Sequence, residues 1–286
     1  MSKYLTDSQI HEINSWEEFQ RMVTGTQYKR WAFRGHEKSE WCLNSTLWRY
    51  LTDFNLHRSI WAHQENRIIR LFRRKAELFL QHVPKEDDLF QWLALMQHHG
   101  APTRLLDFTW SPFVAAFFAL EKAKTADCAV WAVNSSALQE KKYLFQHEQA
   151  HREAPQPECL ESYNRFFISN EVAFITAGEP YNMNQRQIAQ AGTFLVPGII
   201  DKPIEAILST WPNPEKIIAK FILKSSSIRE EAMESLYYMN ITNATLFPGI
   251  DGLARSLAYE LEFHWGFNTR TGKNNPGFNY IDSDNN

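Results

Sequence analysis

The chain has 286 residues, of which 44% are hydrophobic, and carries a formal net charge of −3. This length and composition fit one large or two small globular domains with a sizeable core, and the charge excludes an overall basic field for nucleic acid. Aromatic residues reach 14%, including 10 Trp, so we expect a dense core with some rings left to line a ligand pocket.

Cysteine usage and the terminal segment bear on the cellular setting. The three cysteines, Cys42, Cys128 and Cys159, are odd in number and lack metal-ligand spacing, so neither a disulfide framework nor a zinc site is expected. The first residues are polar and amphipathic rather than a signal peptide, and no apolar run reaches transmembrane length. We expect a cytoplasmic protein without a membrane partner.

The first elements in chain order are a helix, a strand and a long helix. Residues 15–23 predict a short helix capped by Ser15, and residues 30–35 predict an aromatic strand that ends at a glycine. A helical pattern fills residues 58–83. Its segment 67–75 has a basic outer face, which is either simply solvated or a contact for phosphate or RNA.

The elements that follow alternate with turns rich in Gly and Pro. The predicted strands cover residues 105–109, 128–133, 172–176, 192–197 and 217–223. The predicted helices cover residues 88–98, 113–124, 228–239 and 253–263. Ser111 caps the helix from residue 113, with Pro112 at its first position.

The fold class follows from this mixture of helices and short strands. It predicts an α+β fold with small mixed or antiparallel sheets and flanking helices. A single domain is expected over residues 1–265, with a helical excursion at about residues 134–165. Residues 266–286, rich in Asn, Gly and Asp, are expected to form a disordered tail.

An Arg-Gly pair ends the aromatic strand. The guanidinium of Arg34 presents a fixed fork of donors that suits phosphate or carboxylate. Gly35 would let the backbone approach a ligand closely. The dipeptide alone is more typical of an arginine that caps or forms an ion pair at the end of a strand, because Arg-Gly pairs are common.

The segment from Gln97 to Leu120 places many polar residues in an apolar frame, where each buried polar group needs a partner. Arg104 and Asp107 either pair with each other or contact a ligand. Adjacent His98 and His99 face different ways on a helix, so a two-His metal site is not expected. One of them would be structural and the other a ligand contact. The polar residues are Gln97, His98, His99, Thr103, Arg104, Asp107, Thr109 and Ser111.

These motifs resemble the FRG domain family, in order from about residue 15 to residue 260. The sequence WAFRGH matches the motif that names the family. A Gln-His-x-Gly-x-Pro-Thr-x-Leu-Leu-Asp-x-Thr block runs from Gln97 to Thr109, followed by Pro112 and an Ala/Phe helix. Two further elements are Gln190-x-Gly-x-Phe and the Leu-Phe-Pro-x-x-Asp-Gly-Leu run at residues 246–253.

A looser resemblance is to ADP-ribosyltransferases of the Arg-Ser-Glu type. It implies an ADP-ribosyltransferase-like core in which Arg34 and Gly35 contact NAD, while Thr109 and Ser111 supply hydroxyls before the Ala/Phe helix. The implied activity transfers ADP-ribose from NAD to a protein or nucleic acid. A toxin or phage-defence effector restrained by an antitoxin or another regulatory partner would use such chemistry.

The third element of such enzymes is a glutamate that stabilises the oxocarbenium-like transition state. Gln187 and Gln190 stand in its expected place and bring no negative charge, so Asp107 and Asp251 are the better candidates for a carboxylate. For Asp251 itself, a helix cap is favoured over a catalytic role.

The predicted site has two parts and no metal. The residues expected to be catalytic are Arg34, Thr109, Ser111, Gln190 and Asp107. The residues expected to bind NAD are Arg34, Gly35, Gln97, His98, Thr103 and Arg104. Two alternatives stay open. One is a non-catalytic module that senses a nucleotide or an RNA end, and the other is a hydrolase in which a histidine beside Asp107 acts as general base.

Overall fold

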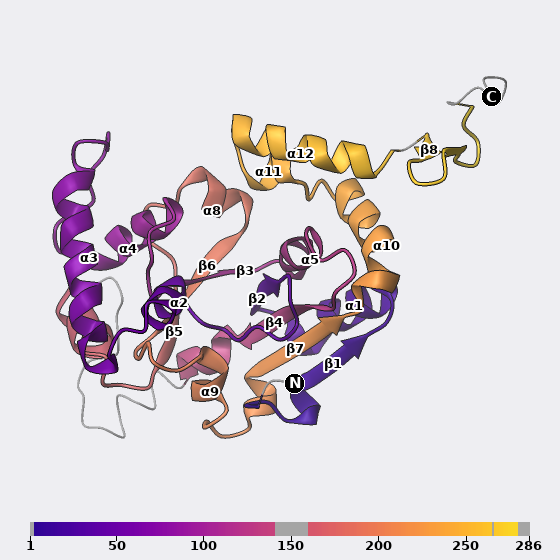
Figure 1. Cartoon of the computed structure of the whole chain (residues 1–286). Coiled ribbons are helices and arrows are strands. Elements are labelled where there is room, and N and C mark those ends of the chain that lie inside the picture. Colours follow the sequence, from indigo (N-terminus) through magenta and orange to yellow (C-terminus); the bar gives the residue numbers. More distant parts are fainter. Residues whose placement is uncertain (1–2, 141–159, 265, 280–286) are drawn as a thin grey trace.

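The computed structural model of the chain describes residues 3–140, 160–264 and 266–279. Its centre is a single twisted sheet of seven strands with helices packed on both faces, while α12 (Ile250–Glu262) lies along the rim (Figure 1). All neighbouring strands are antiparallel except the first pair. The strand order is β1 (Ile10–Ile13), β7 (Ile218–Leu223), β4 (Cys128–Asn134), β2 (Trp31–His36), β3 (Leu106–Thr109), β6 (Gly192–Pro197) and β5 (Ile175–Gly178).

The mixed α/β character agrees with the prediction, but the size of the sheet does not. The sequence predicts small sheets, whereas the seven strands join into one because β2 and β4 pair along six residues and bridge both halves. The other α-helices are α1 (Trp16–Thr24), α2 (Thr46–Asp53), α3 (Trp61–Ala76), α4 (Leu89–His98), α5 (Pro112–Leu120), α7 (Leu160–Tyr163), α8 (Gln185–Ala189), α9 (Ile204–Leu208), α10 (Ser225–Tyr238) and α11 (Asn243–Leu246).

Local capping signals are confirmed. The Ser15 side chain accepts a hydrogen bond from the Glu18 backbone N–H, and Ser111 accepts one from Val114 with Pro112 at the start of α5. Among the elements named so far, five short ones lack a predicted counterpart, namely β1, α2, α8, α9 and α11. The helix predicted over residues 58–83 begins with a 3₁₀ turn and ends at Ala76.

Two segments of the sequence, residues 134–165 and the segment from residue 266 onward, have a weak hydrophobic pattern. The predicted excursion at 134–165 falls largely on residues 141–159, which lie outside the described residues, while residues 135–140 and 160–163 are helical. The sequence predicts disorder from residue 266 onward, whereas Phe267–Asn268 (β8) pairs with Lys273–Asn274 (β9) as a short antiparallel ribbon. The last residues of that segment, 280–286, also lie outside the description.

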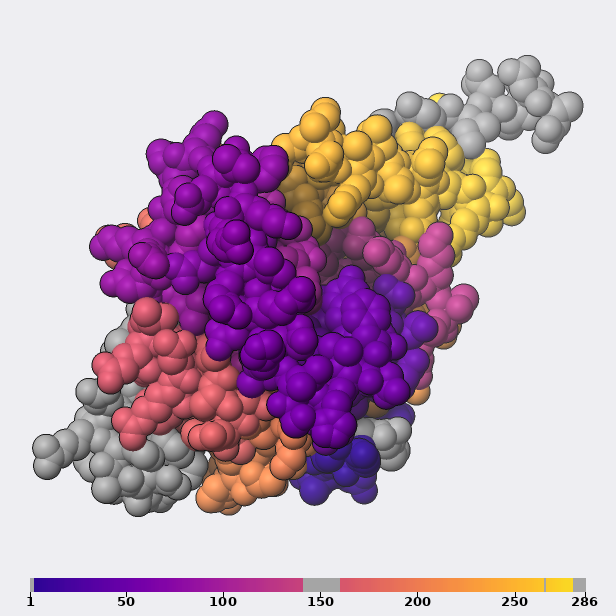
Figure 2. All heavy atoms as spheres, turned by 60° about the vertical axis from the view of Figure 1, so that its left-hand side comes forward, coloured from indigo at the N-terminus to yellow at the C-terminus, as the bar shows by residue number. Residues whose placement is uncertain are grey.

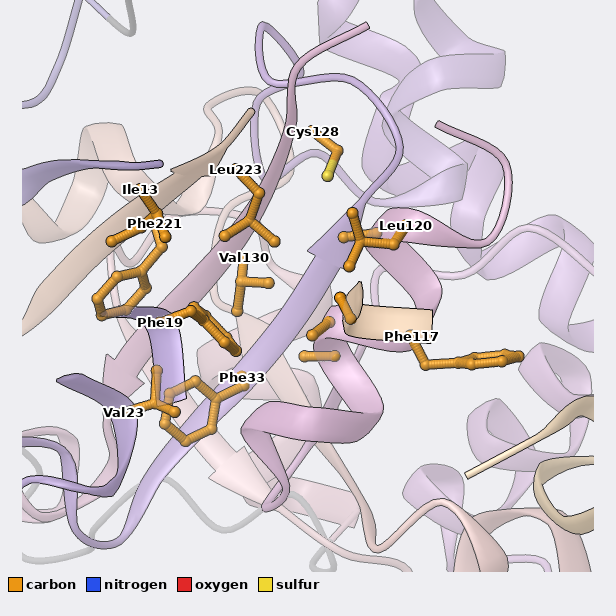
Figure 3. Packing of buried hydrophobic residues seen from close by; sticks show 14 of the residues in the cluster. Ile13, Phe19, Val23, Phe33, Phe117, Leu120, Cys128, Val130, Phe221 and Leu223 are labelled. Carbon is orange, nitrogen blue, oxygen red and sulfur yellow. The ribbon is translucent and has the colours of Figure 1, made fainter. Parts of the chain in front are cut away.

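One face of the sheet packs against α1, α5 and α10. Phe33, Val130 and Phe221 project from neighbouring strands into this layer and meet Phe19 and Leu120 (Figure 3). The other face packs against α9 through a second cluster that includes Trp131. Side chains alternate along a strand, so β2 directs Phe33 to the first face and its neighbour Arg34 to the second.

Gly35 shows why this alternation matters. A Cβ built on Gly35 would lie 2.0 Å from the carbonyl oxygen of Ala115 and 2.7 Å from the backbone nitrogen of Ala119, both on α5. The space that a side chain at Gly35 would need is filled by the backbone of α5. Gly35 therefore sets how closely α5 can approach β2.

Candidate functional site

A cavity of about 540 Å³ opens above β2 and β3 and is bounded by α2, the end of α5 and α8. The surface is hollowed between the purple segment around residues 45–100 and the yellow C-terminal helices (Figure 2). A volume of this size is typical of a site for a small molecule or cofactor. Of the predicted residues, Arg34, Gly35, Asp107 and Gln190 line it.

The cavity is rich in cations. Its lining includes Arg34, Arg49, Lys122 and Arg186, from four different parts of the chain. Burial lowers the pKa of Arg34, and the like charge of Arg49 lowers it further, against the opposing effect of Asp107. Burial likewise lowers the pKa of Arg186. These cations raise the electrostatic free energy of one another, and a bound anion would relieve that repulsion.

Arg34 is held in place by two hydrogen bonds. Its Nη1 donates to the backbone oxygen of Asp107 at 2.6 Å, and its Nε donates to Nε2 of His36 at 3.0 Å. The carboxylate of Asp107 lies 3.9 Å from Nη1, and 58% of the Asp107 side chain is exposed. Arg34 is thus oriented without being neutralised by a buried ion pair.

Asp107 is positioned by a short chain of side chains. Gln97 donates from Nε2 to the Asp107 carboxylate at 2.7 Å, and Thr103 donates to Oε1 of Gln97 at 2.7 Å. Thr103 is fully buried and lies outside the cavity lining. The sequence predicts Gln97 and Thr103 as NAD ligands. In the structure, their hydrogen bonds position the carboxylate of Asp107.

A smaller polar recess of about 50 Å³ adjoins the main cavity. It contains His98 and shares Asp107, Arg186 and Gln190 with the larger cavity. Burial lowers the pKa of His98, with smaller effects from His99 and Arg186, so its neutral form is favoured. The amide of Gln190 donates to the Leu246 carbonyl at 2.9 Å, which ties this edge to α11.

Arg104 lies elsewhere. It is fully buried and forms a two-pronged ion pair with Glu65 on α3, with its Nε 2.7 Å from Oε1. Its Nη1 also donates to the carbonyl oxygens of Pro197 and Gly198. The sequence offers Asp107 as the partner of Arg104, but the partner in the structure is Glu65 of the long helix α3. Arg104 therefore connects α3 to β6.

Thr109 and Ser111 are also engaged in structure. The Thr109 hydroxyl donates to the Gln190 carbonyl at 2.7 Å and accepts from the Ser111 backbone N–H. The Ser111 hydroxyl caps α5. Neither residue lines the cavity. Asp251, in the first turn of α12, lies outside the lining as well.

Sequence reasoning missed several lining residues, including Trp41, Trp48, Arg49 and Lys122. Trp41 is 42% exposed although it is a large apolar ring. The high tryptophan content was the one signal in the sequence that aromatic rings line a pocket. Nothing in the local pattern tells which of the 10 Trp residues do so.

The chain is a mixed α/β protein with a cavity lined by several cations. The FRG domain family model matches residues 29–128, so the chain carries an FRG domain. This span runs from just before β2 to the start of β4 and supplies Arg34, Arg49 and Asp107. No curated protein and no solved structure matches the chain.

No cluster of three or more His, Cys, Asp or Glu side chains in the described part of the chain is placed to hold a metal ion. No helix within it is both long enough and apolar enough to span a membrane.

Proposed function

We propose that the cavity binds NAD and that the protein transfers ADP-ribose from it to a protein or nucleic-acid acceptor. The observation that carries this proposal is the set of four cations, Arg34, Arg49, Lys122 and Arg186, around one cavity. The pyrophosphate of a dinucleotide carries two negative charges. The planar guanidinium groups match its oxygens in pairs, which a point charge cannot do.

The aromatic lining supports a nucleotide rather than inorganic phosphate. Trp41 and Trp48 line the cavity together with Phe118, and flat rings of this kind stack on bases and nicotinamide. A cavity of about 540 Å³ also has room for more than a phosphate group.

Transfer of ADP-ribose breaks the bond between ribose C1′ and the nicotinamide nitrogen, and positive charge develops on the ribose. A carboxylate beside C1′ would stabilise that charge. Three carboxylates line the cavity, on Glu37, Asp107 and Glu121. Asp107 is the best placed in our proposal because Gln97 orients it beside Arg34, whereas Glu121 accepts a hydrogen bond from Asn243.

Calorimetric titration of the full chain with NAD tests binding, and release of free nicotinamide tests turnover. We expect Arg49→Ala and Arg186→Ala each to weaken NAD binding about tenfold, since each removes one charge-assisted contact worth ~1.5 kcal/mol. Arg70→Ala is the matched control, because Arg70 is exposed on α3 and outside the cavity. Equal losses in all three variants, or no binding by the wild type, would reject the proposed site.

A second candidate function is nucleotide binding without turnover. The observation in its favour is that the hydroxyls of Thr109 and Ser111 bond to backbone groups instead of facing the cavity. It predicts saturable NAD binding and ligand-dependent thermal stabilisation with no nicotinamide release. If nicotinamide is released, label from the ADP-ribose part of NAD appears on a protein or nucleic acid of an added cell lysate, and Asp107→Asn slows both at least 100-fold while NAD still binds, the transferase proposal holds.

A further inference from the structure

A further cavity of about 230 Å³, here called the α12 cavity, adjoins the proposed NAD cavity at the end of α5. Glu121 and Lys122, which directly follow α5, line both cavities. The other walls of the α12 cavity come from α10, α11 and α12. The proposed binding of NAD gives this cavity no role.

The lining of the α12 cavity carries an excess of positive charge. It contains four cations and two carboxylates, namely Lys122, Lys124, Arg229, Arg255, Glu121 and Glu262. Arg229 forms a two-pronged ion pair with Glu262, which leaves three cations against the carboxylate of Glu121. The whole chain has a net charge of −3, so this excess is a local feature of the surface.

The three remaining cations are open to a ligand. Within the described part of the chain no ion pair is formed by Lys122, Lys124 or Arg255, and all three are exposed. The carboxylate of Glu121 accepts a hydrogen bond from the amide of Asn243 at 2.8 Å instead. Their donors can therefore bind an external anion.

The ring of Phe247 connects the cations of the two cavities. The guanidinium carbon of Arg186, in the NAD cavity, lies 4.7 Å from the ring centroid, and that of Arg255, in the α12 cavity, lies 5.2 Å from it. Burial lowers the pKa of Arg186, Asp107 opposes this effect, and the like charge of Arg255 adds to it. The cations therefore continue from one cavity into the other and repel one another.

NAD alone does not use all of these cations. Lys124 and Arg255 line only the α12 cavity, so a pyrophosphate bound beside Arg34 leaves both of them without an anion. A single strand of nucleic acid carries one phosphate per nucleotide. A nucleotide at the mouth of the NAD cavity would therefore place a neighbouring phosphate in the α12 cavity. A duplex keeps its bases stacked and paired, and a protein offers anions only where Asp or Glu happens to lie.

We propose that the acceptor of ADP-ribose is a single-stranded nucleic acid, and that Lys124 and Arg255 bind a phosphate next to the modified nucleotide. This inference rests on the proposed transferase function and selects nucleic acid over protein as the acceptor. In the transfer, an oxygen or nitrogen of the nucleotide forms a bond to C1′ of the nicotinamide ribose. The bond from C1′ to nicotinamide breaks, its electron pair stays on the nicotinamide nitrogen, and the proton of the acceptor atom passes to water.

Binding is tested by fluorescence anisotropy, with the full chain and labelled single strands of DNA and RNA about 12 nucleotides long that contain all four bases. Lys124→Gln and Arg255→Gln should each weaken binding about fivefold. Each should also reduce the slope of log Kd against log salt concentration by about 0.7, the value for one phosphate of a single strand. Affinity for NAD, measured by calorimetry, should stay within twofold of the wild type because neither residue lines the NAD cavity.

The matched control is Arg70→Ala, because Arg70 is exposed on the basic face of α3 and lines neither cavity. Thermal unfolding of each variant checks that the fold is intact. If Arg70→Ala lowers both affinity and salt slope while Lys124→Gln and Arg255→Gln do not, the nucleic acid binds on α3 and the inference is rejected.

Transfer is tested with NAD labelled in its ADP-ribose part. The label should appear on the single strands more than on a duplex of the same sequence. At a subsaturating concentration of strand, Lys124→Gln should slow the labelling about fivefold. Label on the proteins of a cell lysate and on no nucleic acid would make the acceptor a protein and overturn the inference, while the proposed function stands. If the wild type binds no NAD or releases no nicotinamide, the proposed function fails and the acceptor site fails with it.

Discussion

Arg104 and Arg34 come from the same FRG domain but have opposite environments. Arg104 is fully buried, and its guanidinium meets the Glu65 carboxylate and two backbone carbonyls. Arg34 faces a cavity shared with other cations and has a single carboxylate at 3.9 Å. The difference teaches that a polar residue in a mostly apolar segment indicates a ligand site only where its hydrogen bonds and ion pairs within the protein are incomplete.

The same contrast separates two further groups of residues. Thr109 and Ser111 have their hydroxyls fully engaged with backbone groups, as Arg104 has its guanidinium. His36 and Asn44, which the sequence did not indicate, line the cavity. Four predictions, in order of decreasing effect, test this division.

The largest effect is expected from breaking the Arg104 ion pair. Glu65→Leu leaves a buried guanidinium without its carboxylate, so we expect a loss of about 3–5 kcal/mol in the free energy of unfolding. Denaturant unfolding measures it. The double variant Glu65→Leu/Arg104→Met should recover most of the loss, because no charge stays buried. A loss below about 1 kcal/mol in the single variant would show that the pair is not structural.

Gly35→Ala should come next, at about 2 kcal/mol, since the added Cβ overlaps the α5 backbone and forces β2 and α5 apart. Gly25→Ala is a matched control with its nearest atom at 3.1 Å, and a smaller loss is expected there. Both are measured by thermal unfolding. Equal losses at the two positions would contradict the packing role of Gly35.

The pH dependence of stability tests the buried neutral state of His36. Burial lowers the pKa of His36, and also that of His11 and His98, so the unfolded chain binds more protons than the folded chain as the pH falls below about 6.5. Stability should therefore decrease with acidification, by at most about 1.4 kcal/mol per pH unit for each group. His36→Phe should flatten the profile of unfolding free energy against pH. An unchanged slope in that variant would mean that folding does not lower the pKa of His36.

The smallest effect is expected at Ser111. Ser111→Ala removes the cap of α5 and should lower the free energy of unfolding by about 1 kcal/mol. Affinity for NAD, measured by calorimetry, should stay within twofold of the wild type because the hydroxyl faces the helix. A large loss of affinity for NAD at unchanged stability would show that the Ser111 hydroxyl contacts the ligand.

Local elements were predictable where their signals are local. Ser15 and Ser111 mark helix starts, and the run from Gly192 to Pro197 has the bounds of β6, because caps, proline and apolar runs act within a few residues. The helix α2 was missed even though Ser45 caps it and Leu47 and Leu51 follow at helical spacing. Eight residues between loops give too short a pattern to stand out.

The site could be predicted only in part. Arg34 and Asp107 were found from their motifs, and both line the cavity. The other cations were not, because Arg49 and Arg186 belong to the separate helices α2 and α8, which only the tertiary fold brings to the cavity. Glu65, 39 residues before Arg104, was equally out of reach of local reasoning.

The sequence by itself determined the helices and strands with strong periodicity, the FRG motifs and the candidacy of Arg34 and Asp107. The tertiary structure decided which polar residues became structural and which stayed open to the cavity. Hydrogen bonds and ion pairs depend on distances of about 3–4 Å between atoms that can be far apart in the chain, and only the folded sheet sets those distances. For this reason Arg104, which the motif places beside Asp107, serves the core, while His36, an unremarked neighbour of Arg34, became part of the cavity wall.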